Sequence, residues 1–127
     1  MGAYPKGTKA TIFLETNLYD HVYTRVRVRN IGIGNLRFKQ EEDGTYAFSG
    51  TIHDDYGPAR ILGGKMDATH ATFRLVYNTG IDEELAEEID FNLENSIYGG
   101  WSGNFTYTSP KSNEATTGNA ICAIIAT

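Results

Sequence analysis

Ser102 and the three histidines are the side chains whose types suggest catalysis, but their surroundings in the sequence do not support it. Residues 100–104, GWSGN, approach the Gly-x-Ser-x-Gly turn that exposes a hydrolase nucleophile, with Asn104 at the position of the last Gly. The histidines lie far apart and lack metal-ligand spacing, at His21, His53 and His70. We therefore predict a protein that is not an enzyme, with no catalytic residue, no metal site and no cofactor.

Two further short motifs carry chemistry in other proteins. His53–Asp55 sets one imidazole beside two carboxylates, which suits metal binding or proton exchange if the three converge, and a solvated turn if they do not. Residues 32–37, GIGNLR, begin like a dinucleotide-binding loop, but Arg37 stands where the third Gly belongs and no βαβ pattern surrounds it. Neither motif identifies an activity.

The elements that must position any site are β-strands, because apolar and polar residues alternate along almost the whole chain. The alternation predicts strands at residues 9–16, 21–29, 35–40, 45–53, 59–66, 70–78, 87–95, 100–108 and 119–127. We expect one all-β domain over residues 1–127, an antiparallel β-sandwich of eight or nine strands, with a closed calycin-like β-barrel as the alternative. Residues 81–88 are the one helical candidate, and residues 109–118 read as a mobile loop.

Charge and composition restrict the classes of function. The chain has a net charge of −5 and a pI near 5.1, so we expect no nucleic-acid partner. Its single cysteine, Cys122, lies in an apolar run and is predicted to be a buried, inert thiol. The opening residues lack the apolar core of a secretory signal. We expect a protein that is soluble when synthesised, cytoplasmic or released, and that meets any membrane from outside.

Between Phe48 and Trp101 the central strands carry Gly50, Gly64, Lys65, Asp67, Phe73 and Leu75, and the following strand and loop carry Leu93, Glu94, Asn95, Ile97 and Gly99. At these positions the chain resembles the aegerolysin family, and residues 11–33 also fit the start of that family. The likeness is nearest to the branch that supplies small subunits of bacterial binary insecticidal crystal proteins. The resemblance implies a β-sandwich that binds membrane lipid. It also implies a larger protein partner that completes a pore-forming, insecticidal toxin.

Our first hypothesis for function is accordingly a non-enzymatic, cytolysin-like protein that binds lipid membranes. Amphipathic aromatic side chains are favoured at the headgroup level of a bilayer, and basic residues add attraction to anionic lipid. The candidate lipid- or ligand-binding residues are Tyr98, Trp101, Tyr19, Tyr56, Arg25 and Arg27. The two arginines belong to a basic row with Arg29, Arg37 and Lys39, whose other interpretation is an exposed strand face.

Two alternatives of different class stay open. Residues 100–108, GWSGNFTYT, loosely resemble an avidin-like strand, which implies a closed barrel holding a small ligand with Trp101 lining its pocket. The second alternative is a self-assembling β-rich structural subunit, a homo-oligomer whose edge strands pair with copies of itself.

Overall fold

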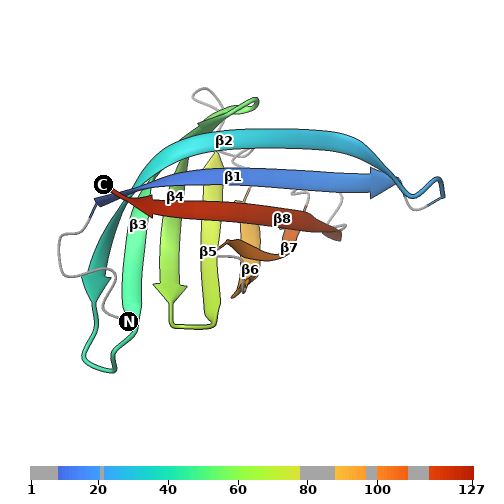
Figure 1. Ribbon diagram of the computed structural model, residues 1–127. Coiled ribbons are helices and arrows are strands. Elements are labelled where there is room, and N and C mark those ends of the chain that lie inside the picture. The colour runs from blue at the N-terminus through green and yellow to red at the C-terminus, as the bar shows by residue number, and fades with distance from the viewer. Residues whose placement is uncertain (1–8, 21, 78–87, 97–99, 109–114) are drawn as a thin grey trace.

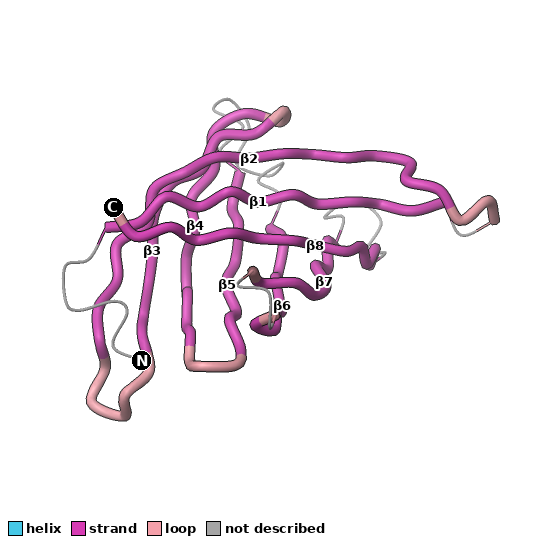
Figure 2. The backbone as a smooth tube through the Cα atoms, in the orientation of Figure 1, coloured by secondary structure: helices cyan, strands magenta, loops and turns pink. Residues whose placement is uncertain are grey.

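A computed structural model describes residues 9–20, 22–77, 88–96, 100–108 and 115–127. These residues form eight strands and no helix, joined by turns where the connections are described (Figure 2). The strands are β1 (Lys9–Asp20), β2 (Arg25–Gln40), β3 (Tyr46–Asp54), β4 (Gly57–Met66), β5 (His70–Tyr77), β6 (Glu88–Asn95), β7 (Trp101–Thr108) and β8 (Ala115–Ala126).

The eight strands close into a single antiparallel barrel in which each strand pairs with its neighbours in sequence (Figure 1). Closure comes from the pairing of β1 with β8, which runs from Ala10 opposite Ala126 to Asn17 opposite Asn119. The all-β prediction is confirmed, and so is the alternative of a closed barrel. The β-sandwich expected first fits in part: its antiparallel strands and enclosed core are present, but the strands belong to one closed sheet.

Strand β2 replaces two of the nine predicted strands. Residues 30–34, between the two predicted strands, continue the alternation with glycines on the inner face, so the chain runs on without a turn. The glycines permit a close approach of β2 to β3. A Cβ atom at Gly34 would lie 2.1 Å from the Thr51 carbonyl oxygen, and one at Gly50 would lie 1.9 Å from that of Asn35. The GIG motif therefore serves strand packing, not phosphate binding.

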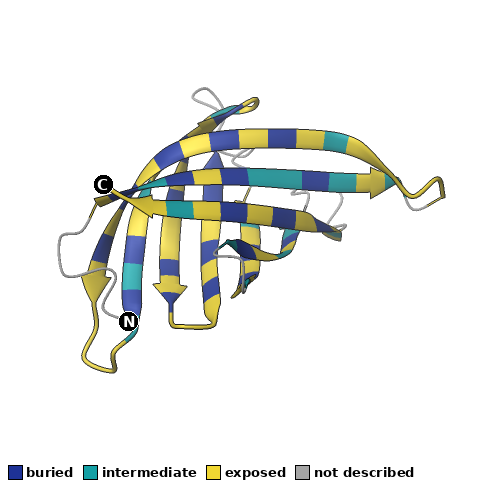
Figure 3. Cartoon of the chain, in the orientation of Figure 1, coloured by how far each residue is buried: buried dark blue, intermediate teal, exposed yellow. Residues whose placement is uncertain are grey.

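Buried and exposed residues alternate along most strands, as Figure 3 shows. An aromatic ladder crosses the interior from strand to strand, with ring centroids 4.6–5.9 Å apart, through Phe38, Phe48, Phe73, Phe91 and Phe105. Aliphatic side chains fill the space around it, and Ile12, Leu36, Ile61, Leu75 and Leu93 are almost fully buried. Apolar burial on this scale is the main stabilising term of the fold.

Two other predicted segments lie partly outside the described residues. Of the helical candidate at residues 81–88, the part up to residue 87 lies outside them, and Glu88 begins β6. Of the loop predicted at residues 109–118, residues 109–114 lie outside them, whereas Ala115 to Gly118 belong to β8. That strand is therefore longer than the alternation at residues 119–127 indicated.

Candidate functional site

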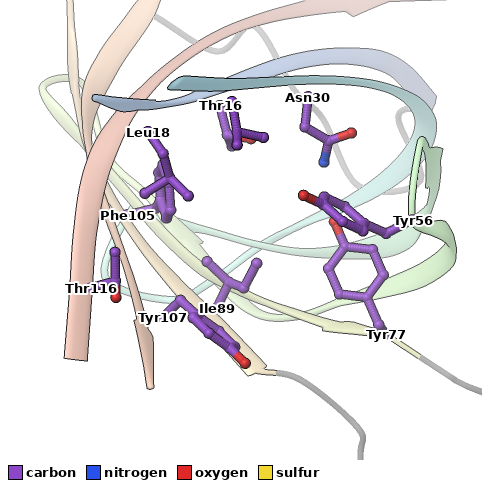
Figure 4. Close-up of a pocket in the computed structure, with 10 residues that line it drawn as sticks. Thr16, Leu18, Asn30, Tyr56, Tyr77, Ile89, Phe105, Tyr107 and Thr116 are labelled. Atoms are coloured by element: carbon purple, nitrogen blue, oxygen red, sulfur yellow. The ribbon is translucent and has the colours of Figure 1, made fainter. Parts of the chain in front are cut away.

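A pocket of about 270 Å³ opens at the end of the barrel where β1, β5 and β7 finish and β2, β6 and β8 begin. Its described lining consists of aliphatic, aromatic and uncharged polar side chains: Thr16, Leu18, Val28, Asn30, Tyr56, Tyr77, Ile89, Phe105, Tyr107 and Thr116. Figure 4 shows Thr16 and Asn30 on one side of the space and Ile89 with Tyr107 on the other. The site is thus an apolar hollow with hydroxyl and amide groups on its wall.

The aromatic ladder ends at this pocket. Phe105, the last ring of the ladder, packs 5.9 Å from Phe91 and also lines the cavity. Because the rings before it are buried in the core, the interior is filled on one side of Phe105 and hollow on the other. The pocket is therefore confined to the barrel mouth and does not run through the barrel.

A buried polar network holds one wall of the pocket. The Asp54 carboxylate accepts hydrogen bonds from the Asn30 side-chain amide, at 2.9 Å, and from the Tyr77 hydroxyl. It also accepts the backbone N–H of Tyr56 at 2.8 Å, while the Asn30 side-chain oxygen accepts the N–H of Asp55 at 3.1 Å. The network joins β2, β5 and the β3–β4 turn, so it fixes three elements of the mouth in one geometry.

Burial raises the pKa of the Tyr77 hydroxyl above its ordinary value, and the hydrogen bond to the Asp54 carboxylate raises it further. Both effects favour the neutral phenol, because ionisation would place two negative charges side by side in a partly dry site. Tyr77 is therefore an uncharged hydrogen-bond donor at neutral pH. The Tyr56 ring stands edge-on to it, with centroids 6.1 Å apart.

The residues predicted from sequence separate into three places. Trp101 is buried, with 7% of its surface exposed, and belongs to the core cluster, so it is neither at the surface nor among the described residues that line this pocket. Tyr56, 66% exposed, stands at the mouth. Tyr98 lies outside the described residues.

The other three predicted residues, Tyr19, Arg25 and Arg27, come together at the distal end of the β1–β2 hairpin. This end projects beyond the other strands in Figure 1. Tyr19 pairs with Val26 and Asp20 with Arg25. The structure thus brings three of the six predicted residues to one end of the hairpin and places Trp101 and Tyr56 elsewhere.

The chemical motifs do not form a reactive site. Asp54 points into the barrel and is buried, whereas its neighbours His53 and Asp55 are exposed, so the three groups do not converge. Ser102 lies exposed within β7. The described residues contain no group of three or more side chains able to hold a metal ion.

The acidic residues of β6 pair within their own part of the sheet. Arg74 of β5 contacts Asp90 at 2.9 Å and Glu88 at 3.4 Å. Among the described residues the basic row makes one ion pair, between Arg29 and Glu15 at 3.2 Å. The other described members of the row therefore have no acidic partner within ion-pair distance on this part of the chain.

Apart from the mouth pocket, an exposed apolar area covers the outer face of β1, β2 and β8. Register places Phe13 opposite both Ile33 and Ala123. About half of each large side chain is exposed in this outer apolar face, which comprises Phe13, Ile31, Ile33, Ile121 and Ile125. The homo-oligomer expected from sequence stays a prediction.

Among the pocket residues that sequence reasoning missed, Asn30 is one that a local signal could have found. It follows Val28 in the inward phase of β2, and a polar residue in an apolar phase signals a buried hydrogen-bonding role. Its partner Asp54 comes from a turn that reads as solvated in the sequence. Only the pairing of β2 with β3 brings the two together.

Comparison with protein-family models, with curated proteins and with solved structures gives no significant match. The aegerolysin-like and avidin-like resemblances therefore stay predictions. In the described part of the chain, no helix has the length and hydropathy needed to cross a membrane.

Proposed function

We propose that this protein binds a small, uncharged and mainly apolar molecule at the mouth of its barrel. The observation that carries the proposal is the mouth pocket, an apolar hollow of about 270 Å³ bordered by an internally satisfied polar network. Ligand sites are typically concave and largely apolar, with a few polar groups that set orientation.

The lining supports this class of ligand. None of the ten described lining residues carries a formal charge, so a charged ligand group would lose its hydration there without gaining an opposite charge. The volume equals that of roughly nine water molecules at about 30 Å³ each, which suits a molecule of two or three rings. The rings of Tyr77, Phe105 and Tyr107 offer faces and edges for aromatic contact.

The experiment uses N-phenyl-1-naphthylamine, an uncharged aromatic dye whose fluorescence rises in apolar surroundings. Titration with the wild-type protein is expected to give saturable enhancement with a stoichiometry of one dye per chain. The variant Thr116→Phe fills the pocket from β8 and is expected to weaken binding at least tenfold, which is about 1.4 kcal/mol.

Thr117→Phe is the matched control, because Thr117 is the next residue on the same strand and is exposed on the outer face. It is expected to bind the dye like the wild type. Equal affinity for both variants, or equal loss in both, contradicts the assignment of the site to the mouth pocket.

A further inference from the structure

The distal end of the β1–β2 hairpin is a two-stranded ribbon that leaves the barrel. Strand β1 pairs with β8 only as far as Asn17, and β2 pairs with β3 only from Ile33 onward. Beyond these points the two strands pair, among the described residues, only with each other, and Figure 1 shows them extending past the remaining strands. A ribbon of this kind receives little stabilisation from the core.

Large apolar side chains are nevertheless exposed along this ribbon. Val22 and Tyr23, in the turn at its end, are 81% and 67% exposed. Tyr19 and Val26 are cross-strand partners just behind the turn, and both are also exposed. The turn itself is local, because the Asp20 carboxylate accepts hydrogen bonds from the N–H groups of Val22 and Tyr23, so its geometry does not require burial of these side chains.

The ribbon also carries exposed basic residues. Arg25, Arg27 and Arg29 are all exposed, and a bulge at Arg27 interrupts the alternation, because Leu18 pairs with Val28 whereas Tyr19 pairs with Val26. Arg29 pairs with Glu15, but within the described residues neither Arg25 nor Arg27 lies within ion-pair distance of a carboxylate. The Arg25 guanidinium instead lies 5.2 Å from the centre of the Tyr23 ring.

We infer that this tip, defined as Tyr19, Val22, Tyr23, Arg25, Val26 and Arg27, docks on an anionic lipid surface. Valine and tyrosine side chains enter the boundary between headgroups and acyl chains, and the two arginines meet lipid phosphates. The charge of the whole chain is −5, so bulk attraction to an anionic membrane is absent and binding depends on the local arginines. This inference does not depend on the ligand proposed for the mouth pocket.

The tip adjoins the pocket along the chain. Leu18 and Val28, which pair across the ribbon, line the pocket, and the next cross-strand pair toward the tip is Tyr19 with Val26.

The test is sedimentation with vesicles of phosphatidylcholine mixed with phosphatidylserine, compared with vesicles of phosphatidylcholine alone. The wild-type protein is expected to bind the anionic vesicles and to bind the neutral ones at least tenfold more weakly. The double variant Arg25→Glu/Arg27→Glu and the double variant Val22→Asp/Tyr23→Asp are each expected to reduce anionic binding at least tenfold.

Ile121→Asp is the control, since it places a charge in the outer apolar face without touching the tip. It is expected to bind vesicles like the wild type. All variants must give the wild-type circular dichroism spectrum and retain dye binding, which separates a failure of docking from a failure of folding or of the pocket.

A local probe gives a second readout. Tyr23→Trp adds an indole at the tip, while the native Trp101 stays buried in the core. Its emission is expected to shift to the blue on addition of anionic vesicles. No sedimentation of the wild type, tip variants that bind like the wild type, or loss of binding in Ile121→Asp alone overturns the inference. So does a change in solution mass in the tip variants without a change in lipid binding, because it assigns the tip to a protein contact.

Discussion

The hairpin tip and one part of the barrel mouth are built from the same two strands but have opposite environments. At the mouth, Val28 and Asn30 of β2 line an enclosed space, and Asn30 joins a polar network in which each described group has a partner. A few residues earlier in the same strand, Val26 and Arg25 have no neighbouring sheet to cover them. The difference shows that alternation sets which way a side chain points, whereas the presence of neighbouring strands decides whether it is buried.

The largest contrast is expected from removing one aromatic ring in each region. Phe91→Ala deletes a ring stacked 4.6 Å from Phe73 in the ladder, and we expect a loss of about 3–5 kcal/mol in the free energy of unfolding. Tyr23→Ala at the tip is expected to change it by less than about 0.5 kcal/mol. Urea denaturation followed by circular dichroism measures both, and similar losses would contradict the contrast between a packed barrel interior and an unpacked hairpin tip.

A second contrast uses two aspartates with the same local role. Asp54 and Asp20 each accept the backbone N–H two residues ahead, but Asp54 also binds Asn30 and Tyr77 inside the barrel. Asp54→Ala leaves buried donors unsatisfied and is expected to cost about 3 kcal/mol, against about 0.5–1 kcal/mol for Asp20→Ala. The same urea denaturation measures the loss in the free energy of unfolding for both variants. Equal losses would mean that the network is not an important constraint on the mouth.

The third prediction concerns the stability of the fold at alkaline pH, and the groups that cause it lie in the barrel interior. Burial raises the pKa of the Cys122 thiol from 9.0 to about 12, and that of Tyr77 is also raised. Both groups are neutral when protonated. Their contribution to the free energy of unfolding is therefore complete at pH values below the pKa of the unfolded state, and it is lost as pH rises through the pKa of the folded state. Between these limits we expect stability to fall by about 1.4 kcal/mol per pH unit for each group.

Two variants assign that loss. Cys122→Ala removes the part that begins near pH 9, and Tyr77→Phe removes the part that begins near pH 10, so each is expected to flatten the decline of the urea midpoint over its own range. Tyr23→Phe at the tip is expected to leave the profile unchanged. A wild-type profile that is flat up to pH 11 contradicts the burial of these two groups.

Much of the strand content could be predicted from sequence, because period-two alternation reports the inward and outward faces directly. The sequence correctly grouped Phe73, Leu75 and Tyr77 on one face, and it placed Phe105 in the core. It could not distinguish a barrel from a sandwich, because that choice depends on the pairing of β1 with β8, whose residues are more than a hundred positions apart. Alternation contains no information about which strands are neighbours.

The candidate sites were predictable only in part, for a related reason. Exposure of Tyr19, Arg25 and Arg27 follows from local polarity and turn position, so these residues could be found. Trp101 begins a strand beside a glycine-rich loop, and nothing local decides that neighbouring strands cover it. The pocket needs residues from seven elements, which no local pattern brings together.

The most direct test of the central claim, a ligand site at the barrel mouth, is mapping of backbone amide shifts by NMR during titration with N-phenyl-1-naphthylamine. We predict that the largest shifts occur at Leu18, Val28, Ile89 and Tyr107, with little change at Ile33 and Ile121 of the outer apolar face. Shifts concentrated on that outer face, with none at the mouth, would contradict the claim.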